Sequence, residues 1–329
     1  MTRILITGGA GFIGSHLAET LLARGQHVTI IDDLSTGSLD NIQHLIGHER
    51  FRFAIETIGN EMVLDRLVSE CDVIFHLAAA VGVQLIIQNP VHTIETNVMG
   101  TEAVLKAALR YRAKVLVAST SEVYGKSEHV PYAESDDVTL GPTARNRWAY
   151  AASKMVDEFL ALAYHREHGL PVVVFRLFNT VGPRQTGQYG MVIPRFVQQA
   201  LAGRPLTVYG DGAQTRCFCN VQDAVRAIAG LAESDAAVGQ VFNVGSTEEV
   251  SILDVARRTL ALVNDGQEDG WREQITLVPY AQAYAEGFED MLRRVPDIGK
   301  IGGAIGWQPT IPLDETLQQV IEFYRQSTR

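Results

Sequence analysis

Two patterns of hydrophobic residues alternate along the first half of the chain. Short runs of consecutive apolar residues suit strands that are buried on both faces of a parallel sheet. The stretches between them place apolar residues at helical spacing, as Leu17, Leu21 and Leu22 do within 15–24. This order predicts a doubly wound α/β fold with helices on both faces of a parallel sheet. The predicted strands are 3–7, 28–31, 51–55, 73–77, 114–118 and 172–177.

The second half of the chain is patterned less regularly. The spacing predicts helices at 191–201, 251–263 and 312–325, strands at 205–209 and 241–245, and a polar surface loop at 264–273. No internal repeat or linker separates the halves, so we expect a smaller C-terminal α/β lobe that grows out of the first domain by insertions. The expected division assigns 1–178 and about 218–245 to the first domain, and 179–217 and 246–329 to the second lobe.

Composition and charge narrow the possible functions. Hydrophobic residues make up 46% and charged residues 20%, which is ordinary for a globular protein. The chain has 28 Lys and Arg against 38 Asp and Glu, and its formal charge of −10 argues against binding nucleic acid or an anionic membrane surface. The apolar runs are too short for a signal peptide or a membrane span, so we expect a cytoplasmic protein.

Cysteine usage agrees with that expectation. The three cysteines, Cys71, Cys217 and Cys219, form an odd set without a secretion signal, which indicates a reduced protein. Cys217 and Cys219 have no second cysteine pair and no nearby histidine to complete a metal site, so we expect no metal.

Three glycines follow the first predicted strand and open the first predicted helix. Gly8 permits a tight turn, Gly11 lets the backbone approach a pyrophosphate, and Gly14 lets helix and strand pack closely. The unpaired N–H groups of the helix N-terminus suit the phosphates. Asp32 ends the second strand, where its carboxylate can accept from both ribose hydroxyls of NAD and repels the 2′-phosphate of NADP. These features predict a Rossmann domain that binds NAD.

Three further positions bear on the cofactor site. The small side chains that follow Leu77 leave room for a cofactor beside the carboxyl edge of the sheet. We expect His76 to be a packed core histidine. Asn97 lies within a helix, where Asn has no propensity advantage, and it either holds the active-site backbone or makes an ordinary polar contact.

Tyr150 and Lys154 stand four residues apart, on one face of a predicted helix. A tyrosine phenol with a pKa near 10 is a poor base. A neighbouring ammonium group and a positive nicotinamide ring both favour the phenolate and bring that pKa toward neutrality. Together with the glycine turn, the pair predicts an oxidoreductase site.

These residues carry a resemblance that extends over essentially the whole chain. The sequence resembles the extended short-chain dehydrogenases/reductases of the NDP-sugar epimerase/dehydratase family. The matching segments are the glycine turn, 32–37, 119–125, Tyr150 with Lys154, 176–179 and 210–216. The resemblance implies oxidation of a sugar hydroxyl, usually at C4, by tightly held NAD, followed by return of the hydride. It also implies a homodimer that forms through two helices of each subunit.

The resemblance assigns roles to individual residues. It makes Tyr150 the base for the 4-hydroxyl, Lys154 its electrostatic partner, and Thr120 a hydrogen-bonding partner of the same oxygen. Ser121 and Glu122 complete the implied catalytic set. The implied cofactor residues are Gly8, Gly11, Phe12, Ile13, Gly14, Asp32, Asp33, Ser35, Thr36, Gly37, Thr57, Ile58, Leu77, Ala78, Ala79, Asn97, Tyr150 and Lys154. The implied residues for a UDP-sugar are Asn179, Thr180, Arg184, Val192, Thr207, Tyr209, Arg216 and Arg294. One departure is Thr57-Ile58, which stands where the family usually has Asp-Ile against adenine.

The residues after Thr120 bear on the reaction. Dehydratases of the family carry Asp-Glu there, and Ser121-Glu122 lacks that acid, so a 4,6-dehydratase ranks third. Thr-Ser-Glu and Arg147-Trp148-Ala149-Tyr150 resemble UDP-glucuronate decarboxylases, and Arg294 matches an arginine which those enzymes use near the carboxylate. Thr-Ser-Glu also occurs in the wider epimerase group. The segment 150–158 lacks the Tyr-Asp-Glu-Gly-Lys form common in dedicated decarboxylases.

We therefore favour a UDP-sugar 4-epimerase that works through a transient 4-keto sugar, with UDP-glucuronate as a candidate substrate. The alternative is UDP-glucuronate decarboxylase. The two differ in one torsion angle of the carboxylate, which we expect Ser121, Thr180 and Arg184 to set. A non-catalytic dinucleotide sensor is a further alternative from another class, but sensors typically lose the catalytic Tyr or Lys.

Overall fold

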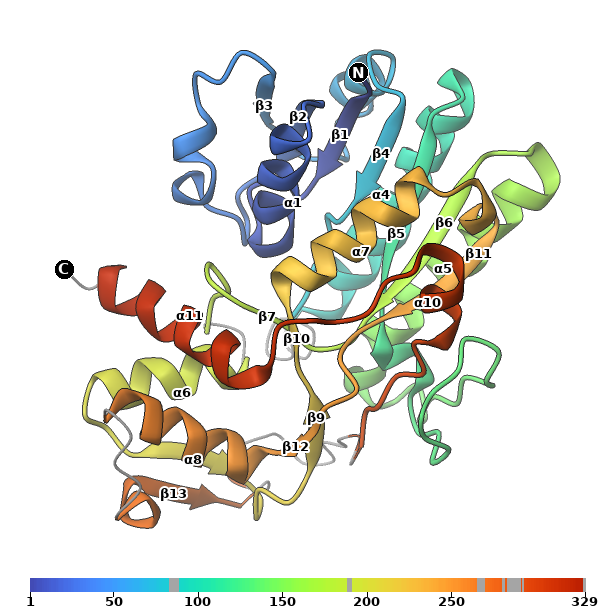
Figure 1. Cartoon of the computed structure of the whole chain (residues 1–329). Helices are drawn as coiled ribbons and strands as arrows, with labels where there is room; N and C mark the ends of the chain where they lie inside the picture. The colour runs from blue at the N-terminus through green and yellow to red at the C-terminus, as the bar shows by residue number, and fades with distance from the viewer. Residues whose placement is uncertain are drawn as a thin grey trace.

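The computed structural model describes residues 1–82, 89–187, 191–264, 270–279, 282, 291 and 293–327. Its centre is a seven-stranded parallel sheet in the order β11-β6-β5-β4-β1-β2-β3 (Figure 1). The strands are β1 (Arg3–Thr7), β2 (His27–Asp32), β3 (Phe51–Ile55), β4 (Val73–His76), β5 (Lys114–Thr120), β6 (Val172–Leu177) and β11 (Gln240–Val244). The predicted doubly wound α/β fold is confirmed, and its strands lie within one or two residues of the predicted bounds.

Helices cover both faces of this sheet. The first core lies under α1 (Phe12–Ala23), α7 (Val221–Glu233) and α10 (Gly299–Ile305). The second core, on the opposite face, lies under α2 (Glu61–Val68), α4 (Pro90–Tyr111) and α5 (Ala149–His168). Apolar side chains fill each layer, because a parallel sheet is stable only when helices bury both of its faces. His76 is buried within β4, as expected of a core histidine.

A third core lies beyond the carboxyl edge of the sheet. It is built by α6 (Val192–Leu201), α8 (Ile252–Val263) and α11 (Leu313–Ser327), with β8 (Leu206–Tyr209) and β13 (Ile275–Val278) as a parallel pair. Figure 1 shows α6, α8 and β13 gathered away from the large sheet. Two more strand pairs lead there, β7 (Thr180–Val181) with β10 (Cys219–Asn220), and β9 (Thr215–Cys217) with β12 (Glu249–Ser251).

Short helical turns complete the described chain. They are η1 (Leu39–Asn41), η2 (Gln43–Leu45), η3 (Ser121–Tyr124), η4 (Asn146–Trp148), η5 (Asp235–Ala237) and η6 (Trp271–Gln274). The polar loop predicted at 264–273 falls partly on 265–269, which lie outside the described residues, and its last residues begin η6.

The C-terminal segment returns to the first core before it enters the third. Ile301 and Trp307 are buried in the first core, although the division expected from the sequence assigns them to the second lobe. Their apolar side chains pack beside α7, a contact between distant segments that local patterning does not reveal. The division into two lobes stays a proposal. We now assign residues 298–307 to the first domain in that division.

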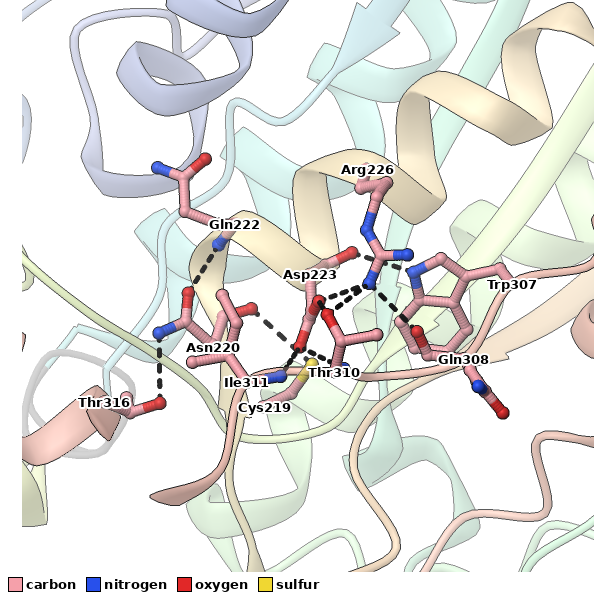
Figure 2. A network of polar contacts seen from close by, with 10 residues as sticks. All are labelled: Cys219, Asn220, Gln222, Asp223, Arg226, Trp307, Gln308, Thr310, Ile311 and Thr316. Atoms are coloured by element: carbon pink, nitrogen blue, oxygen red, sulfur yellow. Dashed lines mark hydrogen bonds and ion pairs between the residues drawn. The ribbon is translucent and has the colours of Figure 1, made fainter. Parts of the chain in front are cut away.

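Buried polar contacts fix this returning segment to α7 (Figure 2). The carboxylate of Asp223 accepts hydrogen bonds from the backbone N–H groups of Thr310 (2.8 Å) and Ile311 (2.9 Å), and also pairs with Arg226. The indole N–H of Trp307 donates to the carbonyl of Asp223 at 3.0 Å. Asp223 is only 1% exposed, and the Thr310 hydroxyl also donates to its carboxylate at 2.9 Å, so protein donors stabilise the buried charge. The network ties the path into the third core to the main sheet.

Candidate active site

A cleft of about 570 Å³ runs along the carboxyl edge of the sheet and between the sheet and the third core. Parallel α/β sheets place ligands at this edge. Most of the predicted site residues line the cleft. They are Gly8, Gly11, Phe12, Ile13, Gly14, Asp32, Asp33, Ser35, Thr36, Thr57, Ile58, Leu77, Ala78, Ala79, Thr120, Ser121, Glu122, Tyr150, Lys154, Asn179, Thr180, Arg184, Val192, Tyr209, Arg216 and Arg294.

Three predicted residues lie behind the lining. Gly37 backs Asp32, since a Cβ at Gly37 would lie 2.8 Å from Asp32 Oδ1. Asn97 is fully buried, and its side chain accepts from the N–H of Ala80 at 2.8 Å, so it holds the backbone beside the cleft. Thr207 is held against α6 through a backbone N–H bond to Gln199 Oε1 at 3.1 Å.

The glycine turn fits a dinucleotide. Gly8 has φ +69°, and a Cβ on Gly14 would lie 2.2 Å from the carbonyl oxygen of Gly8, so neither position accepts a side chain without a shift. Gly11 caps α1, whose first turn has neither a side-chain cap nor an acidic residue. The N–H groups at the start of α1 therefore remain available for the pyrophosphate of NAD.

Asp32 is held firmly at the end of β2. Its carboxylate accepts from the N–H groups of Ala10 and Leu34, both at 2.9 Å. Burial raises the pKa of Asp32, and these backbone hydrogen bonds oppose the shift. The side chain lies between the glycine turn and the loop that follows β2, where the ribose of the cofactor is expected.

Tyr150 and Lys154 meet the end of β5 at the centre of the cleft. Both side chains are at least nine-tenths buried, and the Tyr150 hydroxyl hydrogen-bonds Thr120. Burial raises the pKa of Tyr150, and the negative charges of Glu122 and Asp157 raise it further. The direction is opposite to the one expected from Lys154 alone, because burial and these two carboxylates outweigh the effect of the ammonium charge.

Glu122 lies between two arginines. Its carboxylate pairs with Arg147 through Oε2 and with Arg294 through Oε1, the latter at 3.4 Å. Burial works to raise the pKa of Glu122, but the charges of Arg147, Arg294 and Arg216 lower it to about 2. Glu122 is therefore ionised at neutral pH.

Arg147 is a lining residue that the sequence prediction did not place in the site. It is 4% exposed, and its guanidinium lies 5.7 Å from the ring centre of Trp148. The Arg147-Trp148-Ala149-Tyr150 segment was the signal that could have identified it. Arg195 was also missed; it stacks 4.2 Å above Tyr209 in the part of the cleft formed by the third core.

Two expected substrate residues are arranged in different ways. Arg184 donates to Ser15 Oγ at 3.2 Å and pairs with Glu19, so its guanidinium is engaged by α1. Thr180 lines the cleft, and its buried hydroxyl has no hydrogen-bond partner among the residues that the structure describes. That hydroxyl is available to a bound molecule.

The described residues contain no cluster of three or more His, Cys, Asp or Glu side chains that could hold a metal ion. Cys217 and Cys219 are buried, and burial raises the pKa of both thiols, that of Cys217 to about 12. None of the helices in the described part of the chain combines the length and the apolar character that a membrane crossing requires.

The fold and the cleft together define the class of extended short-chain dehydrogenases/reductases. The sequence model of the GDP-mannose 4,6 dehydratase family matches residues 5–320. The chain therefore belongs to this family of NAD-dependent enzymes.

Named relatives and solved structures resemble the chain over nearly its full length. A UDP-N-acetyl-alpha-D-glucosaminuronate decarboxylase of Bacillus cytotoxicus is 42% identical over 326 residues, which cover 98% of each chain. UDP-glucuronic acid decarboxylase 1 of Xenopus tropicalis is 41% identical over 98% of this chain and 72% of its own length. The Thermotoga maritima UDP-glucose 4-epimerase structure has a TM-score of 0.86 at 28% identity, over 99% of this chain and all of that one. A dTDP-glucose 4,6-dehydratase of Streptomyces venezuelae with bound NAD has a TM-score of 0.86 at 31% identity, over 98% and 97%.

These comparisons support the decarboxylase alternative better than the 4-epimerase that the sequence favoured. The sequence relatives at 36–42% identity carry decarboxylase names, whereas the epimerase structures are 28% identical. The absence of the Tyr-Asp-Glu-Gly-Lys form, which favoured the epimerase, was a weaker guide than the Thr120-Ser121-Glu122 segment.

Proposed function

We propose that the protein decarboxylates a UDP-hexuronate by oxidising its C4 hydroxyl and reducing the ketone again after carbon dioxide has left. The observation that carries the proposal is the pairing of Glu122 with both Arg147 and Arg294 beside Tyr150. Relatives named as decarboxylases of UDP-glucuronic acid and UDP-N-acetylglucosaminuronate support the same reaction class.

In this mechanism Tyr150 handles the proton of the C4 hydroxyl, and Thr120 holds the same oxygen. The glycine turn and Asp32 would hold NAD, which would supply the acceptor for the C4 hydride and the donor for its return. A ketone at C4 is β to the C6 carboxylate, so the C5–C6 bond can break and leave its electrons in a C4 enolate. The protonated Tyr150 stabilises the enolate oxygen by donating to it. C5 then takes up a proton as the ketone forms again.

The charges in the cleft suit this substrate. Three arginines, Arg147, Arg216 and Arg294, act on the single carboxylate of Glu122, so the group has a net charge of 3 − 1 = +2. A UDP-hexuronate presents two anionic groups, a diphosphate and a carboxylate. Arginine side chains pair well with both, because the guanidinium fork matches their oxygens.

Two observations count against the alternative reactions. A dehydratase needs an acid for the leaving hydroxyl, and Glu122, with a pKa of about 2, is ionised at neutral pH. Ser121 cannot replace that acid. An epimerase must hold the carboxylate near the plane of the ketone, and Arg184, one of the three side chains expected to set that angle, is engaged by Ser15 and Glu19 of α1.

The test is incubation with UDP-glucuronate and with UDP-N-acetylglucosaminuronate, followed by mass spectrometry and proton NMR of the products. We expect a product that is lighter by one carbon dioxide, and no product from the Tyr150→Phe variant. An isomer of unchanged mass would establish the 4-epimerase instead, and loss of water would establish the dehydratase.

We also propose that the protein is a homodimer that pairs α4 and α5 with the same helices of a second copy. These neighbouring helices carry large apolar side chains in contact with solvent: Val91, Ile94, Met99, Val156 and Phe159. Large exposed apolar side chains on two neighbouring helices are typical of interfaces. Light scattering should give twice the mass of the chain, and Phe159→Asp should shift it to the monomer; a monomeric wild-type protein would refute this proposal.

A further inference from the structure

Lys154 has a buried counter-ion that the expected catalytic set does not include. Lys154 Nζ donates to Asp157 Oδ2 at 2.6 Å, and the two side chains are 3% and 0% exposed. Asp157 follows Lys154 by three positions on α5, so helical geometry places the two side chains on one face. The carboxylate of Asp157 therefore partly balances the ammonium charge of Lys154 inside the protein.

Asp157 is the end of a longer polar chain. The hydroxyl of Thr101, on α4, lies beside Asp157 and lowers the pKa of that carboxyl, although burial dominates and raises it. Thr101 Oγ1 lies 2.9 Å from His76 Nε2, and His76 Nδ1 lies 2.8 Å from Thr7 Oγ1. Thr7 Oγ1 in turn accepts from the N–H of Ala78 at 3.2 Å.

One set of proton positions satisfies the contacts from Thr7 to Thr101, whereas the buried Oδ1 of Asp157 has no hydrogen-bond partner among the residues that the structure describes. Burial lowers the pKa of His76 to about 3, so its ring is neutral at physiological pH. We assign the ring proton to Nε2, which then donates to Thr101, while Thr7 donates to Nδ1. Thr101 is left to donate to Asp157. All donors then point toward Asp157, as the stabilisation of a buried carboxylate requires.

The charges around Tyr150 come from several elements. Glu122 of η3 and Arg147 of η4 face it from one side, and Lys154 and Asp157 lie on its own helix. His76 of β4 is neutral. The neighbouring Glu158 points elsewhere, because it pairs with Arg176 at 2.7 Å. Asp157 is therefore the carboxylate on α5 that acts on both members of the Tyr150–Lys154 pair.

We propose that Asp157 is a positioning residue that fixes the Lys154 ammonium and keeps the Tyr150 phenol protonated until the nicotinamide ring and the sugar lie beside it. A bare ammonium at Lys154 would favour the phenolate even in the absence of these partners. Asp157 opposes that effect, in addition to burial and the charge of Glu122. A bound oxidised nicotinamide would add a positive charge beside Tyr150 and would favour the phenolate there. The inference rests on the role of Tyr150 in the proposed function.

The test measures the ionisation of Tyr150 directly. The NAD-loaded protein is prepared with tyrosine labelled with ¹³C at the ζ carbon, and Tyr150→Phe identifies the Tyr150 signal. We expect Asp157→Asn, which keeps the shape and removes the charge, to lower the midpoint of the Tyr150 titration by about one pH unit or more. Asp157→Glu should restore most of the shift, since it returns a carboxylate.

Glu158→Gln is the matched control. It removes the next carboxylate along α5, whose ion pair is with Arg176 rather than Lys154, and should leave the Tyr150 midpoint close to that of the wild type. An unchanged midpoint in Asp157→Asn would overturn the proposal. If Asp157→Asn does not fold, Thr101→Val is the second variant. It removes the hydroxyl that stabilises the ionised form of Asp157, so it should lower the Tyr150 midpoint by a smaller amount. An unchanged midpoint in Thr101→Val would overturn the proposal equally.

This readout is separate from turnover. If UDP-hexuronates are not converted but Asp157→Asn moves the midpoint, the proposed substrate is wrong and the role of Asp157 stands. If decarboxylation occurs and the midpoint does not move, the proposed function stands and this inference fails.

Discussion

Arg294 Nη1 lies 3.4 Å from Glu122 Oε1, although the two residues are 172 positions apart in the chain. The contact brings the segment before α10 to the end of β5, beside Tyr150. Arg147 pairs with the other oxygen of Glu122. If Arg294 leaves Glu122 to bind a substrate anion, Glu122 therefore still keeps one arginine partner. Arg294 is therefore the side chain that we expect to meet the carboxylate of the sugar.

Removal of Arg294 should weaken turnover more than it weakens the fold. Arg294→Ala leaves Glu122 with Arg147, but it removes a charged contact to the substrate that is worth about 2 kcal/mol or more, or about 30-fold in kcat/KM. Steady-state kinetics with UDP-glucuronate measures the loss. Arg294→Lys retains the charge without the fork and should recover part of the activity. Unchanged kcat/KM in Arg294→Ala would contradict this assignment.

The glycine turn should not tolerate a methyl group at Gly14. A Cβ there would lie 2.2 Å from the carbonyl oxygen of Gly8, so Gly14→Ala must displace the turn against which NAD is expected to lie. We expect the purified variant to carry less than about a tenth of the normal NAD, because a loss of only about 1.4 kcal/mol in binding costs tenfold in affinity. Chromatography of the nucleotide released on denaturation measures it. Gly303→Ala is the control, since no atom lies within 4 Å of the position that its methyl group would take.

Glu122 should make stability depend on pH in the acid range. Its folded-state pKa of about 2 is below the ordinary value of 4.5, so the unfolded state binds more protons between these values. The stabilisation is present above pH 4.5 and is lost as the pH falls toward 2. Glu122→Gln should therefore lower Tm most near pH 7 and progressively less below pH 4.5. A difference in Tm that stays constant from about pH 7 to about pH 3 would rule out this contribution.

The Asp223 network should be among the larger stabilising contributions at a single position. Asp223→Ala removes a buried carboxylate, leaves the N–H groups of Thr310 and Ile311 without their acceptor, and breaks the ion pair of Arg226. We expect the free energy of unfolding to fall by about 3–5 kcal/mol, as measured by urea denaturation. Asp314→Asn, at an exposed ion pair with Arg258, is the control and should change it by less than about 1 kcal/mol. Equal effects of the two substitutions would contradict the network's role.

The cofactor half of the cleft could be predicted from the sequence, because its signals are local. Buried strands appear as apolar runs, and the turn from Gly8 to Gly14 is a continuous segment whose glycines have a steric reason. Asp32 ends a strand next to that turn. The residues of this half that lie close together in the structure are either close in sequence or stand at the carboxyl ends of neighbouring strands.

The other half depends on contacts that local patterns do not contain. Arg147 and Arg294 approach Glu122 from distant segments, and Trp307 returns to the first core after the chain has left it. Burial raises the pKa of Tyr150, and the carboxylates of Glu122 and Asp157 raise it further; both effects depend on how the chain packs around Tyr150. Most of the residues predicted through the family resemblance line the cleft, whereas the charges that they exert on one another were not predicted.

The attachment of residues 307–311 to Asp223 also sets an order of assembly during synthesis. The glycine turn, Asp32 and the catalytic pair all belong to the first 154 residues, and β6 follows soon after them. Arg294 and the partners of Asp223 are made last. The half of the cleft that holds the cofactor can thus take shape on the ribosome well before the half that holds the substrate. Arg294 and Trp307 are therefore added to a cleft whose glycine turn, Asp32 and Tyr150 have already been synthesised.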